Sequence, residues 1–538
     1  MKKFLSIFIF ISLVINIYGT EAEKKIEETK VVELDSRFKE YKDVDKDLIN
    51  EFKGNFSLEE PFVITNPYSL SPLTAVVIFN TVDETTVSVR VKGKDESSDI
   101  THQFDNYSKN HKVPVYGLYP DKENEVLIET KTKDGKVATN TLKIKTEPLP
   151  NDISKIKVIK NDKSKMTNGL TFFDCPHANG NYFFAIDNNG DIRWYLNDKS
   201  FNGSVMLTHL QNGNFLVGTG QPIPNSYNNL YKVFEVSPLG RYETEYNVYG
   251  IHHDIRERKN GNLIFAASKE GRESQNDYIV EIDRKTGKMV RDWDLMEIIP
   301  MTKYDTPSPY SGGLSNWIHN NALWYLEDED AFVISGRHQN MIAKFGANDK
   351  KLKWVFSGTV AKDNEKLQSF MLKFEDPNME YPFSQHAAMI LPDGKLMLFD
   401  NRNDIENKEP LDQKLLYSRA VIYEIDEKNM TIKEVWEYGK NRGNELYSSF
   451  VSDVDYLGKD HYLINFGGMY QADNGDSYDH IFTKKEIKNA SNRNTIVIEI
   501  LNNEVIFEVI AYGNSNSNTY KVERKDIYLN GNELEIGK

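Results

Sequence analysis

The chain has 538 residues and a formal net charge of −15, and 12% of its residues are aromatic. The acidic balance argues against nucleic acid as a partner, because phosphate binding needs a basic surface. A chain of this length exceeds one typical hydrophobic core, so we expect two domains. Cys175 is the single cysteine, which excludes an internal disulfide and is typical of a small buried residue.

Residues 1–20 have the pattern of a secretory signal peptide. Lys2 and Lys3 precede an apolar stretch from Phe4 to Tyr18, and small and polar residues follow it. The stretch is short for a membrane helix, so we expect export to the periplasm and no membrane span after cleavage, with a retained anchor as the alternative. Residues 21–52 are charged and predict a linker or a short solvated helix.

Residues 53–148 are predicted to form a small N-terminal β-sandwich domain. The segments 62–95 and 112–147 alternate apolar and polar residues between Asn, Asp, Gly and Pro turns. This pattern predicts about seven short strands, as in a β-sandwich. Pro148 and Pro150 mark the expected domain boundary.

Two kinds of hairpin alternate along residues 149–538. One kind, a strand, a polar turn and a strand, recurs six times, at 182–196, 231–246, 278–293, 341–356, 421–436 and 496–509. The other kind precedes five of these copies, at 204–218, 252–265, 319–340, 384–401 and 452–468. Together they make a four-stranded antiparallel unit, and six units predict a six-bladed β-propeller. A seven-bladed or open ring is the alternative.

The first predicted unit lacks one strand. Only the segment 169–175 precedes its outer hairpin, so we expect residues 519–529 to supply the missing strand beside it. Such pairing would close the ring and remove an open sheet edge.

Three histidines occupy the same place in the inner hairpins. His253, His319 and His386 each open one of them. The first strand of each propeller blade lines the axial channel, so the three side chains are predicted to project into one funnel. Asn321 lies two residues after His319 and shares its face, and Arg337 lies on the partner strand.

This set of side chains suits a tetrahedral oxyanion. Arginine forks match sulfate or phosphate oxygens, and one imidazole can attack while another carries protons. A zinc or copper site is the alternative for three imidazoles, but a nearby arginine and the lack of a carboxylate disfavour it, so we expect no metal and no cofactor. Trp317, Phe383 and Phe399 are expected to wall an aromatic pocket.

The chain resembles the bacterial periplasmic aryl-sulfate sulfotransferases, from about His111 to the closing strand. The motifs that carry the resemblance are HHD at 252–254, HNN at 319–321, SGRHQ at 335–339, QH at 385–386 and FDN at 399–401. The resemblance implies an N-terminal β-sandwich and a six-bladed propeller. It also implies transfer of a sulfuryl group between phenols without 3′-phosphoadenylyl sulfate.

The resemblance also implies residue roles. His386 would be the nucleophile that forms a sulfohistidine in a ping-pong reaction, and His319, Asn321 and Arg337 would bind the sulfuryl oxygens.

Further positions are less well matched to the family pattern. Its additional catalytic histidine falls on His252 or His253, and the hairpin register favours His253. A hydroxyl residue of the family site has no clear match, with Ser449 and Ser452 as candidates. Phe383 is the expected aromatic contact to substrate.

Two other functions remain open from the sequence. One is hydrolysis of an aryl sulfate or phosphate ester, and the other is a non-catalytic binding module, since propellers host many functions. No phosphate loop or dinucleotide motif is present, so the expected partners are an aryl sulfate donor and a phenolic acceptor. A homodimer is left open. The remaining histidines are expected to be structural or exposed: His102, His111, His177, His209, His461 and His480.

Overall fold

The structure is a computed structural model. It describes residues 36–51, 54–175, 182–198, 207–218, 223–226, 229–301, 313–358, 364–403, 416–471, 477–478, 492–512, 518–529, 531 and 533–534. The expected signal peptide at 1–20 lies outside these residues. No helix in the described part of the chain has the length and apolar character needed to cross a membrane.

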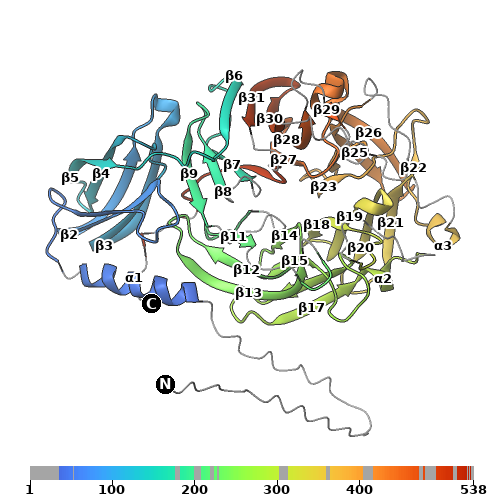
Figure 1. Ribbon diagram of the computed structural model, residues 1–538, viewed down its shortest axis with the longest axis horizontal. Helices are drawn as coiled ribbons and strands as arrows, with labels where there is room; N and C mark the ends of the chain where they lie inside the picture. Colours follow the sequence, from blue (N-terminus) through green and yellow to red (C-terminus); the bar gives the residue numbers. More distant parts are fainter. Residues whose placement is uncertain are drawn as a thin grey trace, which may run out of the picture.

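The N-terminal domain is one curled antiparallel sheet (Figure 1). Its five strands are β1 (Phe62–Thr65), β2 (Thr74–Val91), β3 (Ile100–Tyr116), β4 (Glu123–Thr132) and β5 (Val137–Lys145). The sequence predicts about seven short strands here, as in a sandwich. The described residues give five because β2 and β3 run for 18 and 17 residues. The long β2 pairs with β1, β3 and β4, so the sheet curls around one buried face.

The charged segment before this domain contains a packed helix, α1 (Ser36–Glu51). The Asp45 carboxylate accepts a hydrogen bond from the Tyr68 hydroxyl at 2.7 Å. It also pairs with the Arg241 guanidinium at 2.7 Å. The segment 36–51 is a helix, one of the two expected forms, but Leu48 is 2% exposed, so one face of α1 is buried rather than solvated. Through Asp45 the helix connects the N-terminal domain to the following domain.

The rest of the described chain forms six sheets. Three consecutive sheets contain β10 (Thr208–His209), β11 (Phe215–Gly218), β12 (Leu230–Val236) and β13 (Tyr242–Ile251); β14 (Ile255–Glu257), β15 (Leu263–Ala267), β16 (Tyr278–Ile282) and β17 (Met289–Asp294); and β18 (Asn320–Leu326), β19 (Ala331–Gly336), β20 (Met341–Gly346) and β21 (Leu352–Ser357). The next two sheets contain β23 (His386–Ile390), β24 (Leu396–Asp400), β25 (Arg419–Asp426), β26 (Thr431–Tyr438) and β22 (Lys373–Phe374); and β27 (Asp453–Gly458), β28 (His461–Gln471), β29 (Ser477–Tyr478), β30 (Asn492–Leu501), β31 (Glu504–Tyr512) and β6 (Lys155–Asn161). The last sheet joins β32 (Val522–Lys525) to β7 (Leu170–Cys175), β8 (Tyr182–Ile186) and β9 (Ile192–Asn197). Two short α-helices, α2 (Leu295–Ile298) and α3 (Glu365–Gln368), lie between strands.

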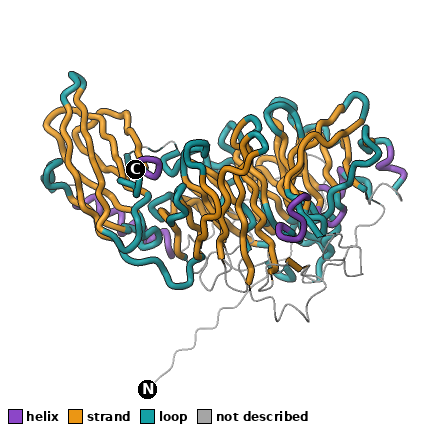
Figure 2. Tube along the Cα trace, turned by 90° about the horizontal axis from the view of Figure 1, so that it is seen from above, coloured by secondary structure: helices purple, strands orange, loops and turns teal. Residues whose placement is uncertain are grey.

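These sheets are arranged in a ring, the architecture of a β-propeller. Figure 1 shows β14, β18, β23 and β27 toward the middle and β13, β17 and β21 at the rim. Figure 2, turned by 90°, shows the propeller strands stacked side by side with the N-terminal sheet at one end. The first strand of each inner hairpin is therefore the strand nearest the axis.

Strands from the two ends of the ring domain pair with each other and close the ring. Strand β32 pairs antiparallel with β7, with Val522 opposite Phe173. The predicted pairing of the segments 519–529 and 169–175 is confirmed, although the strand itself covers only Val522–Lys525. Strand β6, which the sequence analysis did not predict, adds an outer strand to the sheet that contains β31.

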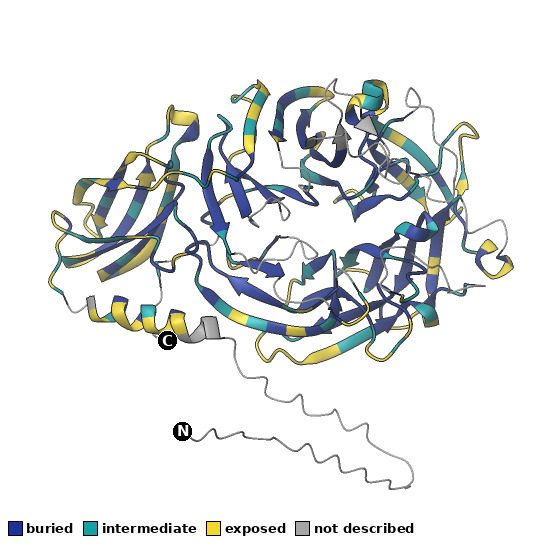
Figure 3. Cartoon of the chain, viewed as in Figure 1, coloured by how far each residue is buried: buried dark blue, intermediate teal, exposed yellow. Residues whose placement is uncertain are grey.

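A repeated tryptophan contact joins neighbouring sheets. The indole N–H of each outer tryptophan donates to the outer turn of the next sheet: Trp194 to the Pro238 carbonyl at 2.8 Å, Trp293 to the Ala347 carbonyl at 2.7 Å, Trp354 to the Glu427 carboxylate at 2.9 Å and Trp436 to the Asn503 side chain at 2.7 Å. The faces between sheets are buried (Figure 3), and these hydrogen bonds satisfy the donor that each large ring carries into them.

Candidate active site

The three histidines converge at one end of the inner strands. His253 lies two residues before β14, His319 directly precedes β18, and His386 is the first residue of β23. His253 and His319 both have a φ of +50°, in the left-handed region that histidine adopts only occasionally. These unusual backbone turns at the strand starts aim the two rings at each other.

His253 and His319 form a hydrogen-bonded pair through their Nε2 atoms, which are 2.9 Å apart. The side-chain amides of Asn276 and Asn316 donate to Nδ1 of His319 at 3.2 and 2.8 Å. Because Nδ1 of His319 accepts these bonds, its proton lies on Nε2 and is donated to His253. The neighbours therefore determine the tautomer of both rings.

His338 extends this pair. Its ring stacks on His319 with the centroids 4.6 Å apart, and its Nδ1–H donates to the Asn316 carbonyl at 2.6 Å. His338 belongs to the SGRHQ motif, but it was not among the expected site residues. Its signal was its position in the SGRHQ segment beside Arg337.

His386 lies on the other side of the cluster and is 2% exposed. Its Nδ1 is 2.7 Å from Oδ1 of Asn401. Burial, and then the positive charge of Arg337, lowers the pKa of this ring to about 3. His386 is therefore uncharged near neutral pH, which leaves one ring nitrogen with a lone pair.

Tyr520 joins the two halves of the cluster. Its ring centroid lies 5.0 Å from that of His253 and 5.4 Å from that of His386. Its hydroxyl donates to the Asn321 carbonyl at 3.3 Å. Tyr520 was not among the expected site residues, although it stands two residues before β32, as His253 does before β14.

The electrostatics of the cluster combine neutral imidazoles with one permanent cation. Burial is the main cause that lowers the pKa of His253 and His319 well below the usual value. The Arg337 charge adds to this effect on both rings. Burial also lowers the pKa of His252 to about 4 and, together with Arg337, that of His338 to about 3. Such a site favours a bound anion.

His252 lies behind His253. Its ring centroid is 5.0 Å from that of His253 and 6.4 Å from that of His319, and its side chain is 1% exposed. His253 makes the hydrogen bond to His319, so of the two neighbours His253 is the one that joins the pair.

Asn321 positions the backbone next to His386. Its side-chain amide donates to the Gln385 carbonyl at 2.8 Å. The Gln385 side chain in turn donates to the Ser335 hydroxyl and to the Met341 carbonyl, both at 3.1 Å. One amide N–H of Asn321 is thus engaged within the protein, and its Oδ1 is buried without a hydrogen-bond partner among the described residues.

Two of the three expected aromatic wall residues are core residues instead. Trp317 and Phe399 are both 0% exposed, and each packs in a hydrophobic cluster between sheets. Phe399 lies on β24 and packs toward the next sheet, whereas Trp317 lies in the bend before β18, and both large side chains fill closely packed apolar space. Phe383 is partly exposed and lies under the Arg402 guanidinium, 5.2 Å from its ring centroid.

The candidate serines lie in the segment before β27. Ser449 is buried, and its carbonyl accepts a hydrogen bond from the Asn403 side chain at 3.0 Å. The Ser452 hydroxyl accepts from the Gly467 amide at 3.1 Å and lies 2.8 Å from the Ser448 hydroxyl. The contacts of Ser452 are therefore to its own segment and to β28.

The histidines outside the inner register lie elsewhere. His102 stacks on Tyr528, and His111, His209 and His461 lie within 2.9 Å of the carboxylates of Glu533, Glu523 and Glu499. His177 and His480 fall outside the described residues. No group of three His, Cys, Asp or Glu side chains in the described part of the chain is placed to hold a metal ion.

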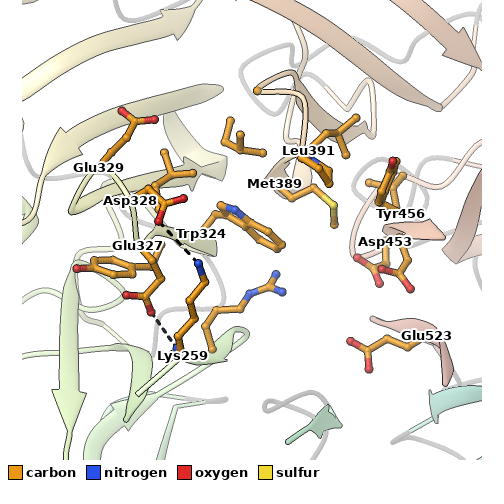
Figure 4. Close-up of a pocket in the computed structure, with 18 of the residues that line it drawn as sticks. Lys259, Trp324, Glu327, Asp328, Glu329, Met389, Leu391, Asp453, Tyr456 and Glu523 are labelled. Carbon is orange, nitrogen blue, oxygen red and sulfur yellow. Dashed lines mark hydrogen bonds and ion pairs between the residues drawn. The ribbon is translucent and has the colours of Figure 1, made fainter. Parts of the chain in front are cut away.

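A cavity of about 700 Å³ lies toward the other end of the same strands (Figure 4). Trp324 and Lys259 line one side, and Asp453 and Glu523 line the other. None of the clustered histidines lines this cavity. The cavity holds charges of both signs, whereas the histidine cluster has Arg337 as its permanent charge.

Comparisons with known proteins identify the family of the chain. Residues 155–521 match the arylsulfotransferase (ASST) family model, and residues 62–147 match the arylsulfotransferase Ig-like domain. The chain is 27% identical over 515 residues to arylsulfate sulfotransferase AssT of Escherichia coli O6:H1, covering 76% of this chain and 84% of that protein. It is 25% identical over 510 residues to arylsulfate sulfotransferase AssT of Lelliottia amnigena, with the same coverage. Because the family model spans more than half of the chain, this protein belongs to the arylsulfotransferase family.

Proposed function

We propose that the protein transfers a sulfuryl group from an aryl sulfate to a phenolic acceptor, without a nucleotide donor, through a covalent intermediate on His386. The observation that carries this proposal is the buried cluster in which a neutral His386 lies near the His253–His319 pair and the Arg337 charge. Family membership and the names of the two curated relatives support the substrate class.

The first displacement uses His386 as the nucleophile. A lone pair of its ring attacks the sulfur, an N–S bond forms, and the bond between sulfur and the aryl oxygen breaks with its electrons moving to that oxygen. Arg337 stabilises the charge on the sulfuryl oxygens together with the second amide N–H of Asn321, and the Nε2–H of His319 joins them when the substrate displaces its hydrogen bond to His253. A proton supplied through the His253–His319 pair leaves with the phenolate as phenol.

The second displacement reverses these steps with a different phenol. The acceptor loses its proton to the histidine pair, its oxygen attacks the sulfur, and the N–S bond breaks with the electron pair returning to His386. Donor phenol leaves before acceptor phenol binds, so the kinetics are ping-pong. No step needs a metal or a cofactor, because the side chains supply the nucleophile, the proton carrier and the oxyanion donors.

The N-terminal sequence suggests where in the cell the reaction takes place. We propose that residues 1–20 direct export and that the reaction takes place in the periplasm. Recovery of the enzyme in the periplasmic fraction, with an N-terminus near residue 20, tests this part separately.

The test is an assay with an aryl sulfate, with and without an added phenol, in the presence of a chelator and in the absence of nucleotide. We expect steady phenol release and a sulfated acceptor only when the added phenol is present. Equal release without an acceptor would identify a hydrolase instead. Loss of transfer in the chelator, restored by zinc, would identify a metal site.

A further inference from the structure

Asn401 makes a buried hydrogen bond to His386 that the proposed reaction has not used so far. Oδ1 of Asn401 lies 2.7 Å from Nδ1 of His386. Asn401 is 0% exposed and His386 is 2% exposed, so water does not compete for either atom. Asn401 directly follows β24, the strand that pairs with β23.

The orientation of the Asn401 amide is determined by two other contacts. Its Nδ2 donates to the Ser448 carbonyl at 2.8 Å and to the Val451 carbonyl at 2.9 Å. Both N–H groups of the amide therefore point at acceptors. A flipped amide would place Oδ1 against two carbonyl oxygens and Nδ2 against His386, which loses two hydrogen bonds. The oxygen therefore faces the imidazole.

The segment that presents these carbonyls is itself held in an unusual conformation. Val451 and Ser452 have φ values of +47° and +87°, and a β-branched residue rarely adopts such a value. A hydrogen bond from the Gly468 amide to the Ser448 hydroxyl, 2.8 Å long, holds this segment against β28. Strained backbone of this kind persists where the surrounding contacts determine it, and it is common at functional sites.

We propose that Asn401 is a positioning residue that holds the single proton of His386 on Nδ1, so that Nε2 carries the lone pair that attacks sulfur. Oδ1 of an amide can only accept, so Nδ1 of His386 must be the donor in this contact. This inference rests on the proposed function, since it assigns the attacking atom of the same nucleophile.

The amide also suits the second displacement. Attack through Nε2 gives an N-sulfonated ring that keeps its proton on Nδ1 and carries a positive charge. An asparagine cannot take that proton, so cleavage of the N–S bond releases a neutral imidazole with its electron pair back on Nε2. A carboxylate in the same place could take the proton and leave a far poorer leaving group, the imidazolate.

The neighbouring carboxylate is directed elsewhere. Asp400 accepts from the backbone amides of Phe383 at 2.9 Å and Arg402 at 3.1 Å, and from the Arg419 guanidinium at 3.2 Å. Successive residues of an extended segment point to opposite faces. The neutral amide of Asn401 therefore faces His386, and the Asp400 carboxylate faces away from it.

The first experiment uses the unaltered enzyme. We expect ¹⁵N NMR of protein labelled at histidine side chains, with His386 assigned by comparison with His386→Asn, to show the proton on Nδ1 near neutral pH. A proton on Nε2 would overturn the proposal. This measurement does not depend on the folding of an Asn401 variant.

The second experiment compares Asn401→Leu with Asn403→Leu. Asn403 is also 0% exposed and donates to the same segment, at the Ser449 carbonyl, but it makes no hydrogen bond to His386 among the described residues. We expect Asn401→Leu to slow phenol release by ~10- to 10²-fold with little change in KM, the scale for removing a partner that orients an imidazole. Asn403→Leu should keep the rate, with thermal melts to check folding. Equal rates in the two variants would contradict the proposal.

A third measurement separates this inference from the proposed function. Peptide analysis of the sulfated wild-type enzyme should place the sulfuryl group on Nε2 of His386. A group on Nδ1 of His386 would reject the role of Asn401 but keep the nucleophile. A group on another residue, or none at all, would reject the nucleophile itself.

Discussion

At the scale of single residues, the site combines neutral nitrogen nucleophiles with one permanent cation. Burial lowers the pKa of His386 to about 3, so its attack on sulfur needs no prior deprotonation near neutral pH. The burial of His386 also makes the charge of Arg337 effective at this ring, because electrostatic interactions with a buried group are stronger than in water. Nucleophile and oxyanion donor are therefore both ready before substrate binds.

The first prediction concerns His386. We expect His386→Asn to abolish phenol release from an aryl sulfate even when no acceptor is added, because the first displacement needs the ring nitrogen. Wild-type enzyme should instead release one equivalent of phenol and gain the mass of one sulfuryl group on the peptide that contains His386. Full turnover by the variant, or a burst without added mass on that peptide, would show that another residue attacks.

The second prediction concerns Arg337. We expect Arg337→Ala to slow phenol release by ~10²- to 10³-fold, the usual scale for deleting one strong oxyanion donor. Arg337→Lys should recover part of the rate, since it keeps the charge but loses the planar fork that matches two sulfuryl oxygens. Burst kinetics of the three proteins provide the measurement. A rate for Arg337→Ala within a few-fold of wild type would remove Arg337 from the oxyanion site.

The residues of the site were predictable only where they repeat. His253, His319 and His386 recur in one hairpin register, and the structure brings the three into one cluster. Tyr520 lies in the closing segment, and His338 lies at the end of the 319–340 hairpin, where no other inner hairpin carries a histidine, so no periodicity indicated either residue. Phe399 was misassigned because both faces of β24 are buried, so alternation along the strand cannot separate the channel from the core. Trp317 was misassigned because it lies before β18, where no strand pattern shows which way its side chain points.

At the scale of secondary structure elements, closure by β32 connects stability to the site. This strand supplies the inner edge of the sheet that contains β7, and Tyr520 lies two residues before it. A disturbance of β32 should therefore affect folding and activity together.

The third prediction tests this connection. We expect Val522→Pro to lower the melting temperature and to reduce phenol release, because proline removes the buried backbone N–H that donates to the Asp453 carboxylate at 3.4 Å at the start of β32. Val137→Pro serves as the control, since Val137 is 49% exposed and opens the edge strand β5, where proline is tolerated. Similar melting temperatures for the two variants would mean that β32 is not needed for closure.

The fourth prediction concerns α1. We expect Asp45→Ala to lower the free energy of unfolding by ~1–3 kcal/mol, because it leaves the Arg241 guanidinium and the Tyr68 hydroxyl without their shared partner. Asp43→Ala on the same helix should cost less than ~1 kcal/mol, since the Asp43–Lys46 pair is exposed. Urea unfolding compares the two. Equal losses would show that α1 does not connect the two domains.

The elements themselves were predicted well where turns mark them. Asn-Gly and Asp-Gly turns and alternating residues located the hairpins of the ring, and the closing strand was found from the unit that lacked a partner. The sequence did not distinguish helix α1 from a linker, because the segment is mostly charged and only a few apolar and acidic residues bury one of its faces. Strand β6 was missed because four of its seven residues are lysine or asparagine, as is common at a solvated sheet edge.

At the scale of the whole molecule, the ring stacks two chemically different environments along one axis. The strand starts hold the neutral histidines, and the cavity of about 700 Å³ lies toward the strand ends with acidic and basic side chains together. Burying several imidazoles in a neutral state has a consequence for the stability of the whole fold. The folded protein resists protonation of these rings, whereas the unfolded chain does not.

The fifth prediction follows from that difference. The folded pKa of His338 is about 3, and its unfolded value is near 6.5, so between pH 7 and pH 5 the unfolded chain takes up a proton at this residue that the folded protein does not. Unfolding is thereby favoured by about 2 kcal/mol at pH 5 relative to pH 7 for this one ring, and this stabilisation is fully present only above the unfolded pKa. His338→Gln cannot titrate, so its loss of stability from pH 7 to pH 5 should be smaller than that of wild type by about the same amount.

Urea unfolding of both proteins at the two pH values measures this difference, in which the contributions of the acidic residues cancel. An identical pH dependence for the variant and wild type would show that His338 is already protonated in the folded protein or that its ring is not buried.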